Sequence, residues 1–174
     1  KARGEHDLAF ERFERVLPHY ETLGGGAAIE YQLAAIDRAR GRYREAHARL
    51  ERIAPAFASG ILSGKVAGLR LLQSWVALGL DDARSALRLA DEGLADLETH
   101  PDEDLLWRLQ WRRAEALRAL GHTKPALAAY TDAVDAVDRL RKAPLGYRLD
   151  STSLRAKMPL VEQAIAFAAE QQDG

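Results

Sequence analysis

The sequence of 174 residues contains no cysteine, little net charge and no long apolar run. Without cysteine, disulfides, thiolate metal sites and a cysteine nucleophile are excluded. A formal net charge of -1 offers no basic surface of the kind that drives nucleic-acid binding. No apolar segment reaches the roughly 18 residues of a membrane-spanning helix, and no signal peptide opens the chain. We therefore expect a cytoplasmic protein with no nucleic-acid or membrane partner.

Residues that favour strands are also scarce. The chain has 6 valines and 5 isoleucines, against 32 alanines and 26 leucines. Alanine and leucine lose little conformational freedom on entering a helix, whereas strands favour β-branched and aromatic side chains. The composition therefore predicts an all-α fold.

One spacing of small and large residues occurs twice in full, with intervals of 7, 5, 4 and 3 residues. The two series are Ala34, Gly41, Ala46, Leu50, Ile53 and Ala114, Gly121, Ala126, Tyr130, Ala133. A third stretch supplies only the second half, with Gly4, Ala9, Phe13 and Val16. A fourth copy fits at Leu72 and Gly79, and it fits at Ala86, Ala90 and Gly93 only if residues 80–82 carry a two-residue insertion.

The glycines of these copies, at positions 4, 41, 79 and 121, follow one another at 37, 38 and 42 residues. Such a period is typical of helical solenoids. Glycine can end the first helix of a pair with a positive φ, and small residues near the turn let the two helices approach closely. Helix breaks are expected at Gly24–Gly26, Gly41, Ser59–Gly60, Gly79, His100–Pro101 and Gly121. They predict helices over residues 5–22, 27–40, 43–57, 62–79, 82–98, 102–120 and 123–142.

This spacing resembles the tetratricopeptide repeat (TPR), and the resemblance covers most of residues 4–142. It implies an α-solenoid of antiparallel helix pairs, with a half repeat over 1–26 and repeats over about 27–60, 61–100 and 101–142. One position departs from the family pattern, because Asp37 stands where a bulky apolar residue is usual. The half repeat lacks its first helix, so its open flank is a candidate for self-association.

Residues 143–174 are expected to form a loop and a capping helix that covers the last repeat. Asp150 or Ser151 can cap this helix, and Pro159 should start a new helix or kink it. Residues 137–171 also resemble the segment that joins TPR arrays to CHAT domains, which are caspase-like proteases of multidomain bacterial proteins. The shared features are a helix ending in the arginine pair Arg139 and Arg141, a short loop and a long helix.

In the TPR family the first helix of each pair lines a concave groove. By this resemblance, the residues that face or flank the groove are Tyr31, Ala35, Arg38, Leu69, Arg70, Gln73, Val76, Arg108, Trp111, Arg112, Glu115 and Arg118. Aromatic and arginine side chains are enriched at interface hot spots. Trp75 is expected to face the core. The lysine and asparagine positions that grip a C-terminal carboxylate in some TPR domains are replaced here, which argues against binding of chaperone tails.

No residue pattern indicates catalysis. The five histidines are scattered, no serine lies in a G-x-S-x-G elbow, and Gly60–Lys65 is too short for a phosphate loop and follows no strand. We therefore expect no enzymatic activity, cofactor or metal. The predicted function is a non-catalytic module that binds a protein or peptide in its groove, as a regulatory part of a larger bacterial protein. The alternatives are a sensor array of a transcription regulator or signalling ATPase, a self-association module, and an enzyme whose site the sequence does not reveal.

Overall fold

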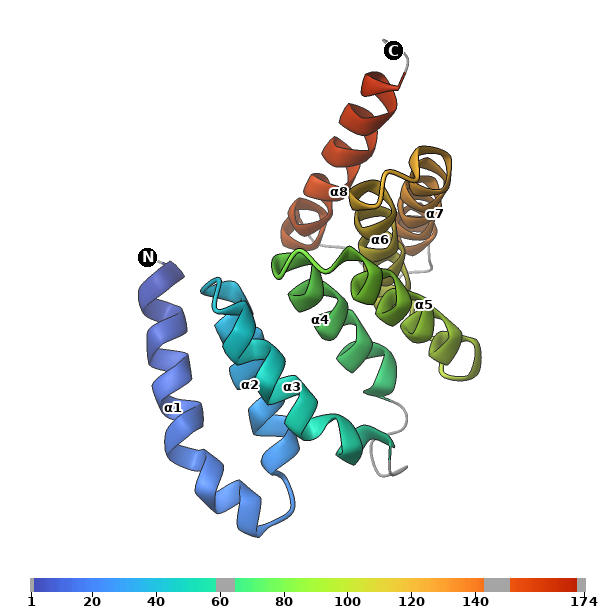
Figure 1. The fold of residues 1–174 in the computed structure, drawn as a ribbon. Coiled ribbons are helices and arrows are strands. Elements are labelled where there is room, and N and C mark those ends of the chain that lie inside the picture. The colour runs from blue at the N-terminus through green and yellow to red at the C-terminus, as the bar shows by residue number, and fades with distance from the viewer. Residues whose placement is uncertain (1, 59–64, 143–150, 172–174) are drawn as a thin grey trace.

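The computed structural model describes residues 2–58, 65–142 and 151–171, and all elements in these ranges are helices. Successive helices pack in antiparallel order, with α1 at one edge of the array, α5 and α7 at the other, and α8 packed against α7 (Figure 1). The elements are α1 (Ala2–Thr22), α2 (Gly26–Ala39), α3 (Tyr43–Ala58), α4 (Val66–Gly79), α5 (Ala83–Thr99), α6 (Glu103–Ala119), α7 (Thr123–Lys142) and α8 (Ser151–Glu170). The all-α prediction is confirmed.

The helix boundaries follow from local chemistry. Asp102 caps α6 by accepting hydrogen bonds from the backbone N–H groups of Asp104 and Leu105, at 2.9 and 3.0 Å. Asp82 caps α5 in the same way through Ser85, at 3.0 Å. The predicted break at Ser59–Gly60, residues 62–64 of the helix predicted over 62–79, the loop at 143–147 and the cap at Asp150 lie outside the described residues.

The structure corrects the predicted register of the third repeat. The turns after α2, α4 and α6 each contain one residue with a positive φ. These residues are Gly41 (74°), Asp81 (61°) and Gly121 (75°), and successive ones are 40 positions apart. In each turn the next backbone N–H donates to the carbonyl five residues earlier: Arg42 to Asp37 at 2.8 Å, Asp82 to Ala77 at 2.9 Å and His122 to Leu117 at 2.9 Å. The predicted two-residue insertion is therefore wrong, and Gly79 belongs to α4.

Small residues at the helix crossings follow the same 40-residue interval. Ala46, Ala86 and Ala126 are all fully buried. Ser74, rather than Leu72, is the counterpart of Ala34, and its hydroxyl donates to the carbonyl oxygen of Ala86 at 2.8 Å. This hydrogen bond satisfies a buried hydroxyl at a position where the other repeats have alanine.

Two glycines have roles that differ from those predicted. A Cβ on Gly79 would lie 2.4 Å from the ring of Tyr43, so this glycine is required by packing rather than by a turn. Gly4 lies inside α1 and not at a turn before it. The turn before α2 contains Gly24, with a φ of 75°, inside the break that the sequence predicts between residues 22 and 27.

The apolar core is divided along the array instead of forming one centre. One cluster lies among α2, α3 and α4 and contains Leu50, Phe57 and Val76. Another lies among α6, α7 and α8 and contains Tyr130 and Leu160. In the described part of the chain, each apolar cluster draws on at least three helices, so no helix pair buries its apolar residues alone, which is the physical condition for a stacked repeat.

Helix α8 covers the last pair, as predicted. Leu160 is fully buried, and Phe167 packs against Tyr130 with 5.7 Å between ring centroids. The helix runs through Pro159 as one element, so of the two outcomes predicted for this residue, a new helix or a kink, the start of a new helix is excluded. Within the described ranges, no helix combines the length and apolar character needed to cross a bilayer.

Candidate functional site

The first helices of the three pairs, α2, α4 and α6, contact one another in sequence along one side of the array. The hydroxyl of Tyr31 on α2 donates to the carbonyl oxygen of Gly68 on α4, at 3.2 Å. The guanidinium of Arg38 lies over Trp75 of α4, which in turn contacts Arg112 of α6. We call this surface the A-helix face and define it by Tyr31, Arg38, Trp75, Arg108, Arg112, Glu115 and Arg118.

The corrected register changes which residues of α4 belong to this face. Leu69 and Gln73 were predicted to face the groove, but they are only 1% and 6% exposed. Val76, the third residue predicted there, is fully buried. With the 40-residue interval, the counterpart of Ala35 and Glu115 is Trp75, which is only partly buried. The prediction that Trp75 faces the core is therefore wrong.

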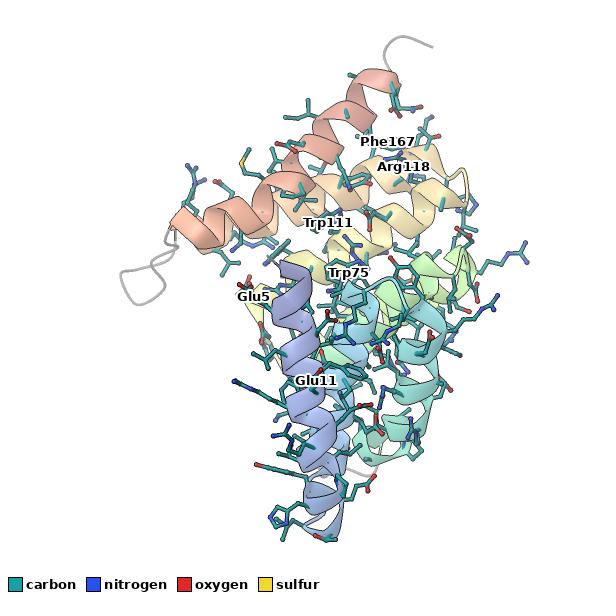
Figure 2. All side chains as sticks on the ribbon, turned by 90° about the vertical axis from the view of Figure 1, so that its left-hand side faces the viewer. Glu5, Glu11, Trp75, Trp111, Arg118 and Phe167 are labelled. Carbon is teal, nitrogen blue, oxygen red and sulfur yellow. The ribbon has the colours of Figure 1, made fainter. Side chains whose placement is uncertain are left out.

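Trp75 is held between two arginines. The guanidinium carbon of Arg38 lies 3.8 Å from the Trp75 ring centroid, and that of Arg112 lies 4.5 Å away. Arg112 also stacks on Trp111, at 4.3 Å. In Figure 2, Trp75 lies near the middle of the molecule, with Trp111 and Arg118 above it towards α8. Each cation–π contact stabilises by about 0.5–2 kcal/mol, more when it is desolvated.

The two arginines differ in their charge partners. Arg112 is 4% exposed and forms an ion pair with Glu115. Within the described residues, Arg38 forms no ion pair, and its Nε is buried without a hydrogen-bond partner. Burial lowers the pKa of both guanidinium groups, and it raises the pKa of the Glu115 carboxyl. The site therefore holds more positive than negative charge in a poorly solvated setting.

A hollow of about 430 Å³ lies beside these charges, between the N-terminal ends of the three first helices. Tyr31 and Leu105 supply apolar surface to the hollow. Gly68 of α4 also lines it and, having no side chain, does not fill it. Burial raises the pKa of the Tyr31 hydroxyl, and the nearby charges of Arg108 and Arg38 oppose this shift. Tyr31, which lines the hollow, is therefore close enough to Arg108 and Arg38 to be affected by their charges.

The remaining predicted residues lie at the edges of this surface. Arg70 donates to Gln73 at 2.8 Å and pairs with Glu92 of α5 at 2.9 Å, so it faces α5. Arg108 pairs with Asp104, one turn earlier on α6, at 2.7 Å.

Helix α8 covers part of α6. The Trp111 indole donates to Gln163 of α8 at 2.9 Å, and Arg118 lies 5.6 Å from the Phe167 ring centroid. Trp111 is 9% exposed and is largely occupied by this contact. Trp75 and Arg38, in contrast, are only partly buried.

A second polar cluster, which sequence reasoning did not find, lies among α1, α2 and α3. Asp37 is buried and pairs with Arg42 at 2.6 Å and with Arg49 at 2.9 Å. Glu30, also buried, pairs with Arg49 at 2.7 Å. Burial opposes the charge of Arg49, but hydrogen bonds to Glu30 and Asp37 offset this and raise its pKa. The only sequence signal for this cluster was Asp37, an acidic residue at a position where the repeat pattern has a bulky apolar one.

Helix α1 joins this cluster mainly through charge and aromatic contacts. Phe10 lies under the guanidinium groups of Arg40, Arg42 and Arg49, at 4.4 to 5.5 Å from its ring centroid. Arg40 also pairs with Asp7. Among the described residues, no group of three histidine, aspartate or glutamate side chains is placed to hold a metal ion.

Comparisons with known proteins agree with this architecture. A search of solved structures finds the crystal structure of a TPR-like protein from Chlorobium tepidum TLS, with a TM-score of 0.71 and 22% identity. The match covers 90% of this chain and 99% of that one. The fold is TPR-like. No protein-family model and no curated protein matches the chain, so the comparison establishes the architecture alone.

Proposed function

We propose that the chain is a non-catalytic interaction module that binds a segment of a partner protein on the A-helix face. The observation that carries this proposal is Trp75, a large aromatic side chain held between Arg38 and Arg112 on a surface that α8 leaves partly open. Tryptophan and arginine are the residues most enriched at binding hot spots. The adjoining hollow supplies a place for an apolar anchor.

Selection from a phage-displayed library of random 16-residue peptides tests the proposal. Wild-type protein is expected to enrich related sequences, and Trp75→Ala is expected to lose them while keeping its helical circular dichroism. Tyr20→Ala is the matched control, because Tyr20 is an exposed aromatic residue of α1. Equal enrichment on wild type and Trp75→Ala, or none on wild type, contradicts the proposal.

A second candidate function is self-association through α1. This helix exposes an apolar stripe of Leu8, Val16 and Tyr20, followed by Leu23, with exposed fractions of 50%, 37%, 43% and 68%. A second copy of the chain could cover this stripe. Sedimentation velocity over a range of concentrations tests this, because Leu8→Ser with Leu23→Ser should abolish any dimer. A chain that stays monomeric at high concentration rejects this candidate.

We further propose that the module is the regulatory part of a larger bacterial cytoplasmic protein. The resemblance of residues 137–171 to the segment before CHAT domains supports a downstream protease, whose activity the module would control. The rival contexts are a transcription regulator and a signalling ATPase. The coding sequence beside this segment decides among them: a His/Cys protease domain favours the first context, and a winged-helix or P-loop segment favours the rivals.

A further inference from the structure

The charges on the A-helix face do not balance. Arg38, Arg108, Arg112 and Arg118 contribute four positive charges, and Glu115 contributes the one carboxylate in the set that defines this face. Asp104, at the edge of the face, neutralises Arg108, and Glu115 pairs with Arg112. Among the described residues, Arg38 and Arg118 form no ion pair; Arg118 lies against Phe167 of α8, whereas Arg38 is partly buried and its Nε has no hydrogen-bond partner.

Arg38 is only partly buried, and Trp75 fixes the orientation of its guanidinium group. One face of its guanidinium rests on the Trp75 ring at 3.8 Å, which fixes the plane of the group. Arg112 lies against the same ring, and the charge of Arg38 helps to lower the pKa of Arg112. A carboxylate bound to Arg38 would relieve this repulsion and supply the missing counter-charge, and a guanidinium fixed in this way suits bidentate contact.

The hollow lies at a defined distance from this charge. Tyr31, which lines the hollow, and Arg38 are seven residues apart on α2, which corresponds to roughly 10 Å along a helix. An extended chain rises about 3.3 Å per residue, so it covers this distance in about three residues.

Resting on the proposed function, we infer that the partner segment is acidic and extended. It places an aspartate or glutamate side chain on Arg38, and an apolar side chain about three residues away fills the hollow beside Tyr31.

The peptides enriched on wild-type protein in the phage selection test this inference. Each is synthesised with an amidated C-terminus, once unchanged and once with every Asp and Glu replaced by Asn and Gln, and is titrated by fluorescence anisotropy. We expect the amide versions to bind wild type about tenfold more weakly or worse. For Arg38→Gln the two versions should differ by less than about threefold, because the discriminating charge is gone. Arg139→Gln removes an exposed arginine of α7 and should behave like wild type.

The outcomes separate this inference from the proposed function. If the selected peptides are neutral or basic, or bind only with a free C-terminal carboxylate, the inference fails and the proposed function stands. An equal loss on wild type and Arg38→Gln assigns the acid to another residue and overturns the role of Arg38. If no peptide is enriched, both proposals fail. Circular dichroism and thermal unfolding of Arg38→Gln confirm that the variant is folded.

Discussion

Replacing Asp37 with alanine should destabilise the protein by about 3 kcal/mol. Removing one partner of a buried ion pair costs about 3–5 kcal/mol, because the other charge stays buried without its counter-ion. The Asp37 side chain is 2% exposed and pairs with Arg42 and Arg49. Arg49 keeps its pair with Glu30 at 2.7 Å, and Arg42 is 40% exposed and can be hydrated. These two features place the cost at the low end of the range.

Urea denaturation followed by circular dichroism measures this cost. With a slope of about 2 kcal/mol per molar, the transition midpoint should fall by about 1.5 M. Asp7→Ala is the matched control, since Asp7 also pairs with an arginine but is 58% exposed, and loss of an exposed pair costs about 0–1 kcal/mol. A cost for Asp37→Ala within about 1 kcal/mol of that for Asp7→Ala would refute the reasoning.

Three further predictions concern the helix ends and crossings. Ala126→Leu should lower the free energy of unfolding by about 1–3 kcal/mol in urea, because Ala126 is fully buried at a close crossing, and a neutral result would contradict that crossing. Gly41→Ala should cost roughly 1 kcal/mol in the same assay, because its φ is 74° and no neighbour obstructs a Cβ; an unchanged midpoint argues against this turn. Asp82→Ala should cost about 1 kcal/mol at neutral pH through loss of the cap. Hydrogen bonds from the side chain and backbone of Ser85 lower the Asp82 pKa below its ordinary value of 3.8, so this contribution is present above that pH and is lost as the pH falls through the folded-state pKa. Thermal unfolding of both proteins should therefore converge in acid, and a constant difference would reject the role of the charge.

The sequence predicted the repeat but placed one turn two residues too early. Glycine is the usual residue at positive φ, so Gly79 was the natural choice for the turn after α4. Aspartate also tolerates this conformation, and Asp81 takes it. The constraint on Gly79 is the ring of Tyr43, which lies 36 residues earlier in the sequence and is visible only in three dimensions. The 40-residue interval between Ala46, Ala86 and Ala126 was the sequence signal that would have corrected the turn.

That error of two residues also displaced the candidate site on α4. On a helix, a shift of two positions turns a side chain by about 200°, so buried residues were assigned to the surface and Trp75 to the core. On α2 and α6 the predicted turns at Gly41 and Gly121 agree with the structure, and Arg38 lies on the A-helix face, but Trp111, predicted to face the groove, is largely covered by α8. Whether these residues bind a partner stays a prediction.

Composition and spacing alone determined the all-α class, the paired helices and the need for a capping helix, because these depend on local propensity and on small residues at fixed intervals. Tertiary structure decided which charges are neutralised. The pairing of Asp37 with Arg49, and the absence of an ion pair for Arg38 within the described residues, depend on the relative placement of side chains from different helices, and the one-dimensional pattern contains no record of those distances.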